Sequence, residues 1–197
     1  MRKITILGIP SILILGLLSA CSGVDVKHAA GRSPELIPQD FFTGKICADG
    51  VVRNRSGEEI RSFNAQILAS WDDNGVGTLD EIFNFYDEAG AEPKRETRLW
   101  TLTPIDTKEG PALKASASDV PNSTVMTYAG NAIYMSYMLR YGEPGDTIDL
   151  HMEDWMFQVA DGVVVNETKM SKFGFHVGQI LLVMRKVSAE TSCLVNG

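Results

Sequence analysis

The sequence predicts an all-β body, an antiparallel meander that closes into a barrel of about ten strands. After residue 40, nearly every segment alternates apolar and polar side chains or is rich in β-branched and aromatic residues. Turn-forming residues separate these segments at hairpin spacing, and neither helical periodicity nor a β-α-β alternation interrupts them. Such a meander can form a sandwich or a barrel, and we favour the barrel because closure removes the exposed sheet edges.

The predicted strands follow one another without a long insertion. They cover residues 41–53, 58–70, 77–87, 94–104, 110–117, 124–128, 131–141, 146–158, 162–172 and 176–187. The turns that separate them contain the strings Ser56-Gly57, Asp73-Asn74-Gly75, Ala89-Gly90, Glu109-Gly110, Gly142-Glu143-Pro144-Gly145 and Asp161-Gly162. Glycine and asparagine are favoured there because tight hairpin turns require positive φ angles.

Residues 1–20 have the layout of a cleaved secretory signal peptide. Arg2 and Lys3 form a basic start, and residues 4–18 form an apolar stretch that small residues follow. A transmembrane anchor is the alternative, but a span needs roughly 20 apolar residues and this stretch is shorter and broken by Pro10. We therefore expect export and removal of this segment.

The string Leu18-Ser19-Ala20-Cys21 resembles a bacterial lipobox, in which the cysteine thiol receives a diacylglycerol before cleavage on its N-terminal side. The chemistry requires a small residue at the cleaved bond and a cysteine directly after it. Ser22 follows in place of an aspartate, which resembles the pattern of outer-membrane lipoproteins. We expect Cys21 to carry palmitate-type acyl chains that anchor a periplasmic body, because two or more chains give stable anchoring.

These assignments divide the chain into four regions. They are the signal peptide (1–20), the acylated cysteine with a tether (21–40), the barrel (41–188) and a C-terminal tail (189–197). Glycine and proline at positions 23, 31, 34 and 38 disfavour regular structure in the tether.

The charge of the chain excludes one class of partner. A net charge of −7 and a pI near 5.0 argue against a nucleic-acid binder, which needs a basic face to displace counterions from phosphates. An acidic body is also repelled by anionic headgroups, so we expect attachment to rest on the acyl chains rather than on a basic patch.

The three cysteines fit no zinc pattern. Once Cys21 is acylated, Cys47 and Cys193 remain, and export delivers them to an oxidising compartment. In a closed barrel with an even number of strands, the start of the first strand meets the end of the last, so these two thiols can form a disulfide. The alternative is a buried Cys47 thiol and a Cys193 that lies in a disordered tail.

Six short strings occur in order between Phe41 and Lys186. They are Phe41-Phe42-Thr43-Gly44, Thr78-Leu79-Asp80-Glu81-Ile82-Phe83, Arg98-Leu99-Trp100, Gly130-Asn131-Ala132, Asp154-Trp155-Met156 and Lys169-Met170-Ser171-Lys172-Phe173-Gly174. Together they resemble the pattern of a proteobacterial lipoprotein family known as domain of unknown function 3833. The resemblance implies a calycin-like, lipocalin-type barrel, and it carries no established activity and no catalytic residues.

Strand alternation places three charged side chains on apolar faces. Asp154 shares a face with Met152 and Met156, Glu81 lies among Leu79, Phe83 and Phe85, and Arg98 shares a face with Trp100. A lone buried charge costs several kcal/mol, so we expect Arg98 to pair with Asp154 or Glu81. Such a cluster is a structural ion pair inside the barrel, or else the polar floor of a ligand cavity or an acid–base pair.

Other candidate sites are weaker. His151 and Glu153 lie two residues apart, but a zinc site requires three or four ligands. No serine lies in a Gly-x-Ser-x-Gly string, and we assign no catalytic residue, metal or cofactor. The methionines of the predicted strands form no histidine-rich copper cluster and are expected to fill the core or line a cavity.

Two functions follow from this sequence. In the first, the barrel holds a lipid or another small apolar molecule. In the second, side chains fill the barrel, and the protein is a structural or assembly lipoprotein that binds another envelope protein. The volume of the interior distinguishes the two.

Overall fold

The computed structural model describes residues 25–88, 90–143 and 145–194, and these form one antiparallel sheet. Its strands are β1 (Gly44–Asn54), β2 (Glu59–Trp71), β3 (Gly77–Tyr86), β4 (Lys94–Thr107), β5 (Gly110–Ser116), β6 (Thr124–Ala129), β7 (Ala132–Glu143), β8 (Asp146–Ala160), β9 (Val163–Lys172) and β10 (Phe175–Val187). Nine of these ten elements begin within a residue of the predicted start. The alternation and turn signals therefore located nine of the strand starts correctly.

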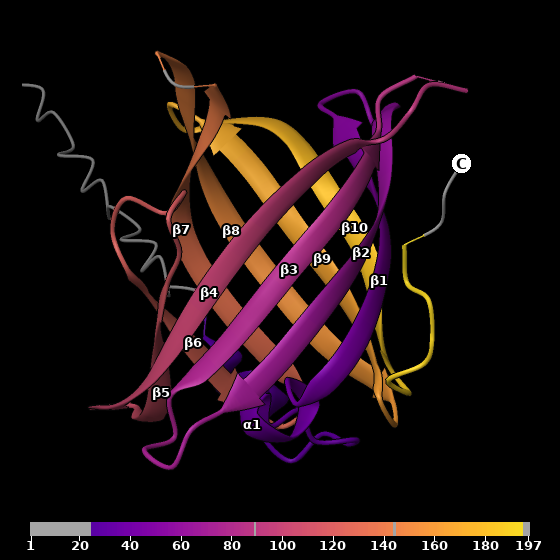
Figure 1. Ribbon diagram of the computed structural model, residues 1–197. Coiled ribbons are helices and arrows are strands. Elements are labelled where there is room, and N and C mark those ends of the chain that lie inside the picture. Colours follow the sequence, from indigo (N-terminus) through magenta and orange to yellow (C-terminus); the bar gives the residue numbers. More distant parts are fainter. Residues whose placement is uncertain (1–24, 89, 144, 195–197) are drawn as a thin grey trace, which may run out of the picture.

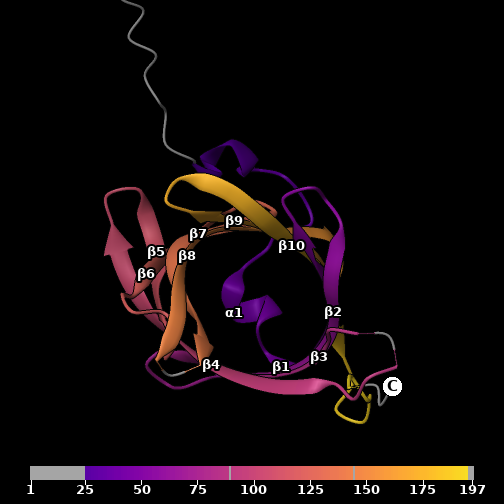
Figure 2. The same ribbon diagram turned by 90° about the horizontal axis from the view of Figure 1, so that it is seen from above.

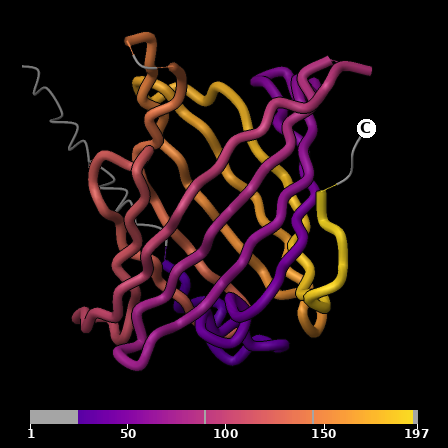
Figure 3. Tube along the Cα trace, in the orientation of Figure 1, coloured from indigo at the N-terminus to yellow at the C-terminus, as the bar shows by residue number. Residues whose placement is uncertain are grey.

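The sheet closes as predicted. Each strand pairs with its neighbour in sequence, and β1 pairs with β10 from Lys45↔Val187 to Asn54↔Gly178. Figures 1 and 2 show the tilted strands from the side and the closed ring from above, and Figure 3 traces the up-and-down path. This up-and-down connectivity is that of lipocalin-type barrels, and it confirms the predicted fold class.

One part of the barrel wall is thin. Only three residue pairs join β5 to β6, and another three join β6 to β7. The β5–β6 loop, residues 117–123, extends the wall there, because the Asp119 carbonyl accepts the backbone N–H of Arg140 at 2.7 Å and Val120 is buried. This loop therefore joins the two sides of the barrel that β4 and β7 form.

The first predicted strand begins too early. Residues 41–43 precede β1, and a short helical turn, α1 (Pro38–Phe41), replaces its predicted start. Proline is favoured in the first turn of a helix because its missing N–H has no partner there in any case. The helix lies across one end of the barrel in Figure 2, and Lys186 Nζ donates to the carbonyl of Asp40 at 2.6 Å.

The predicted tether is partly folded onto the barrel. A 3-10 turn, η1 (Val26–Ala29), packs on β6 and β7. Further along, Leu36 is buried and its N–H donates to the carbonyl of Gly130 at 2.7 Å. Burial of these apolar side chains overrides the glycine and proline signals. Cys21 and the signal peptide lie outside the described residues.

A disulfide joins Cys47 to Cys193, with a Cα–Cα distance of 5.0 Å. Cys193 is buried, and the chain after β10 runs back along the outside of β1, where Lys45 Nζ donates to the carbonyl of Ala189 at 3.2 Å. The geometry expected from antiparallel closure brings the two thiols together.

Within the described part of the chain, no helix is long and apolar enough to cross a membrane.

Candidate functional site

A cavity of about 400 Å³ lies inside the barrel. Its wall is mainly aromatic and aliphatic, and it includes methionines from five strands: Met126, Met135, Met152, Met156, Met170 and Met184. Unbranched thioethers adapt to irregular shapes. The volume lies within the roughly 300–1,000 Å³ of small-molecule sites, so the interior is not filled by side chains.

The two ends of the cavity differ. At the α1 end its wall includes Phe42, whose side chain is buried. At the other end four lining residues remain partly exposed, from 37% to 52%: Ile60, Tyr141, Ile148 and Val177. All four lie near those strand ends that are remote from α1, at the upper rim in Figure 1. The cavity therefore opens at this rim.

The structure places every predicted interior residue on the cavity wall. The set comprises Glu81, Arg98, Trp100, Met152, Asp154 and Met156. The face assignments made from strand alternation are therefore correct for β3, β4 and β8.

The charged residues gather with two that the sequence did not single out, Asp119 and Tyr137. We call these five residues, Glu81, Arg98, Asp119, Tyr137 and Asp154, the interior polar cluster. The predicted partner of Arg98 is wrong: both its Nε and its Nη2 lie 2.7 Å from Asp119 Oδ2. Arg98 is half-buried, and Glu81 is its cross-strand neighbour without forming an ion pair.

Asp154 is held by the neighbouring strand. Its Oδ1 accepts hydrogen bonds from Asn166 Nδ2 and, at 3.1 Å, from Thr168 Oγ1. All three side chains are buried. This network fixes the carboxyl group on β8, whereas Asp119 Oδ1 accepts no hydrogen bond within the described chain.

Burial changes the protonation of the interior polar cluster. Desolvation raises the pKa of Glu81 to about 7, although the Arg98 charge opposes the shift. Desolvation also raises the pKa of Asp154 to about 6 against its hydrogen bonds from Asn166 and Thr168. The pKa of Tyr137 is raised by the same cause, so its phenol stays protonated. Near neutral pH the cavity thus holds a phenol and a carboxyl group that titrates.

This burial predicts a pH-dependent stability. The pKa of Glu81 is higher in the folded state than its ordinary value of 4.5. The contribution of Glu81 to the free energy of unfolding is therefore complete below pH 4.5 and is lost as the pH rises through about 7. At pH 8 we expect Glu81→Gln to have a free energy of unfolding up to about 3 kcal/mol higher than that of the unsubstituted protein. At pH 4 this difference should disappear.

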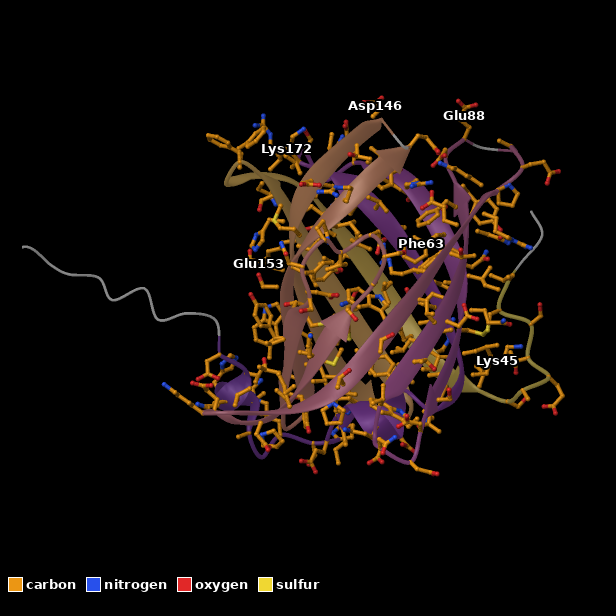
Figure 4. The ribbon with its side chains drawn as sticks, turned by 60° about the vertical axis from the view of Figure 1, so that its left-hand side comes forward. Lys45, Phe63, Glu88, Asp146, Glu153 and Lys172 are labelled. Atoms are coloured by element: carbon orange, nitrogen blue, oxygen red, sulfur yellow. A yellow bond between two sulfur atoms is a disulfide. The ribbon has the colours of Figure 1, made fainter. Side chains whose placement is uncertain are left out.

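Urea unfolding of both proteins from pH 4 to pH 8 measures this difference. Glu153→Gln makes the same change on the outer side of β8 and is the control (Figure 4). An equal effect of the two substitutions at every pH would show that Glu81 does not ionise in a buried site.

A second network lies at the open rim around Arg61. Its Nη1 donates to Tyr141 Oη at 3.1 Å, and its Nε lies 2.7 Å from an oxygen of Asp87. The guanidinium also covers the ring of Phe85 at 3.9 Å. Because β2 and β7 are not neighbours in the sheet, the Arg61–Tyr141 bond spans the mouth of the cavity.

The histidines form no metal centre in the described residues, where no group of three potential ligands occurs. His151 bonds to serines on both sides, with Nε2 2.8 Å from Ser136 Oγ and Nδ1 3.4 Å from Ser171 Oγ. His28 of η1 packs against Trp155 at 6.0 Å. The arrangement of the cavity suits binding of an apolar molecule with one polar end.

A family model described as a protein of unknown function (DUF3833) matches residues 15–186. A solved S-type phycobiliprotein lyase from Guillardia theta is similar with a TM-score of 0.49 and 8% sequence identity, over 77% of this chain and 92% of that chain. No curated protein matches the sequence.

Proposed function

We propose that this chain, which belongs to the DUF3833 family, is a non-catalytic carrier that holds one small apolar molecule inside its barrel. The observation that carries the proposal is the cavity of about 400 Å³, with an apolar wall and one polar cluster. A barrel filled by side chains would suit the alternative of a structural envelope protein, and the open interior favours the carrier.

The interior polar cluster selects the polar end of the ligand. Three carboxyl groups, those of Glu81, Asp119 and Asp154, face one guanidinium, which Asp119 already engages. Asp119 Oδ1 is an acceptor that no described residue satisfies. A ligand end that donates hydrogen bonds, such as an alcohol or an amine, fits these acceptors, and a carboxylate is repelled by them.

The proposal includes a site of attachment. The lipobox supports acylation of Cys21 and an outer-membrane lipoprotein with its body in the periplasm. The Cys47–Cys193 disulfide suits such an oxidising compartment.

Displacement of a fluorescent probe tests the carrier. We expect the protein to enhance the fluorescence of N-phenyl-1-naphthylamine, and 1-dodecanol to displace the probe at a concentration at least about tenfold lower than dodecanoate at pH 8. A tenfold ratio corresponds to about 1.4 kcal/mol, a modest value for one unfavourable buried charge contact.

A pair of variants on β1 locates the binding. Ala48 lines the cavity, so Ala48→Phe places a ring inside it and should abolish the enhancement of probe fluorescence. Val51→Phe, on the outer face of the same strand, should preserve the enhancement. Undiminished probe binding by a folded Ala48→Phe variant would contradict binding in the barrel.

A further inference from the structure

The β9–β10 hairpin ends in an exposed aromatic tip at the open rim. We call residues 172–176 the hairpin tip. Phe173 is 89% exposed and Phe175 is 75% exposed, the two highest values among the large apolar residues described. Phe173 also has a positive φ of 51°, which is uncommon for a bulky residue, so the turn adopts this conformation at a cost.

The sequence of the hairpin around the tip is basic, in contrast to the acidic chain as a whole. No carboxylate occurs from residue 168 to residue 189, and Lys169 and Lys172 precede the aromatic pair. The Lys172 ammonium lies 5.5 Å from the centre of the Phe173 ring. The rim loops around Glu88 and Asp146 are acidic, and Figure 4 shows these residues with Lys172 at the same end of the barrel.

The hairpin tip is continuous with the mouth of the cavity. Val177 lies two residues after Phe175, lines the cavity and is 37% exposed. A β-bulge between His176 and Gly178 shifts the register there. On β8, which only β9 separates from β10, Ile148 is another exposed lining residue. An apolar path therefore leads from the exposed rings into the barrel.

The side of the barrel that carries the hairpin tip also carries the start of the described chain. His28 of η1 packs on Trp155 of β8, and β8 pairs with β9. In Figure 4 the indigo η1 and Lys172 lie on the same side of the barrel. A bilayer along this side can contact the hairpin tip and lie beside η1.

We propose that the hairpin tip docks into the headgroup region of an anionic lipid bilayer. Aromatic rings next to lysines suit the membrane interface, where the rings enter the apolar boundary and the ammonium groups meet lipid phosphates. The inference rests on the proposed carrier function, for which it supplies a route: the ligand moves between bilayer and cavity past Val177.

Site-specific labelling of the full chain tests the docking. Phe173→Cys provides a thiol for a nitrobenzoxadiazole label, since Cys47 and Cys193 are bonded. The labelled protein is mixed with vesicles of phosphatidylethanolamine and phosphatidylglycerol that contain a spin-labelled quencher lipid. We expect a blue shift of the label's emission and loss of most of its fluorescence. Leu99→Cys, at a residue 53% exposed on β4, is the matched control and should show neither change.

The outcomes separate the docking from the carrier function. Equal, weak quenching at positions 173 and 99 would overturn the docking, even if 1-dodecanol still displaces the naphthylamine probe. Quenching at position 173 that survives Lys169→Glu with Lys172→Glu would overturn the role assigned to charge. A second label per chain would come from a free Cys21 thiol. The Leu99→Cys protein would then carry the same second label, and the mass of the labelled peptide would identify its position.

Discussion

Replacement of Arg98 by methionine is expected to lower the free energy of unfolding by about 3 kcal/mol at pH 8. The substitution preserves much of the side-chain volume and removes the cation that pairs with Asp119 at 2.7 Å. Breaking a buried ion pair costs roughly 3–5 kcal/mol because it leaves an uncompensated charge, and partial exposure of both groups places this pair at the lower end.

The loss should be smaller at pH 5. Glu81 and Asp154, with pKa values of about 7 and about 6, take up protons and reduce the repulsion that Arg98 no longer balances. Arg140→Met removes an exposed arginine from its pair with Asp149 and is the control, expected to change stability little. Equal stability of Arg98→Met and the unsubstituted protein at pH 8 would show that the interior polar cluster does not depend on this cation.

Loss of the disulfide has the largest expected effect on stability. The bond closes a loop with a sequence separation of 146 residues, which encloses nearly the whole barrel. Chain-entropy arguments assign such a loop roughly 4–5 kcal/mol, because the cross-link restricts the unfolded chain. We expect the double variant Cys47→Ala with Cys193→Ala to unfold at a correspondingly lower urea concentration.

Reduction provides the matched comparison. Dithiothreitol should lower the unfolding midpoint of the unsubstituted protein to that of the double variant and leave the double variant unchanged. Two free thiols at Cys47 and Cys193 in the denatured, non-reduced protein would contradict the bond.

The strands were predictable because their signals are local. Along β8 the alternation of Ile148, Leu150 and Met152 identified the interior face, and turn glycines marked the ends of the hairpins. The start of β1 was misplaced because Phe41 and Phe42 look like strand residues, whereas burial across the barrel end and the preceding proline favour α1. Local propensity cannot detect a contact with Lys186 at the far end of the chain.

The site was predictable only in part, for a physical reason. Glu81, Arg98 and Asp154 stand out because each is a charge within an apolar face. Asp119 lies in the β5–β6 loop, where a carboxylate is ordinary, and only the thin wall between β4 and β7 brings it to Arg98. Tyr137 carries no signal either, since a tyrosine in a strand is common and its burial depends on packing against Trp100.

Native mass spectrometry of the protein purified from its own host without detergent exchange shows directly whether the barrel holds a ligand. We expect one non-covalently bound apolar molecule per chain, carrying an alcohol, amine or other hydrogen-bond donor, and its absence from the folded Ala48→Phe variant. An empty barrel in the unsubstituted protein, or the same molecule retained by Ala48→Phe, would contradict the assignment of the cavity as a binding site.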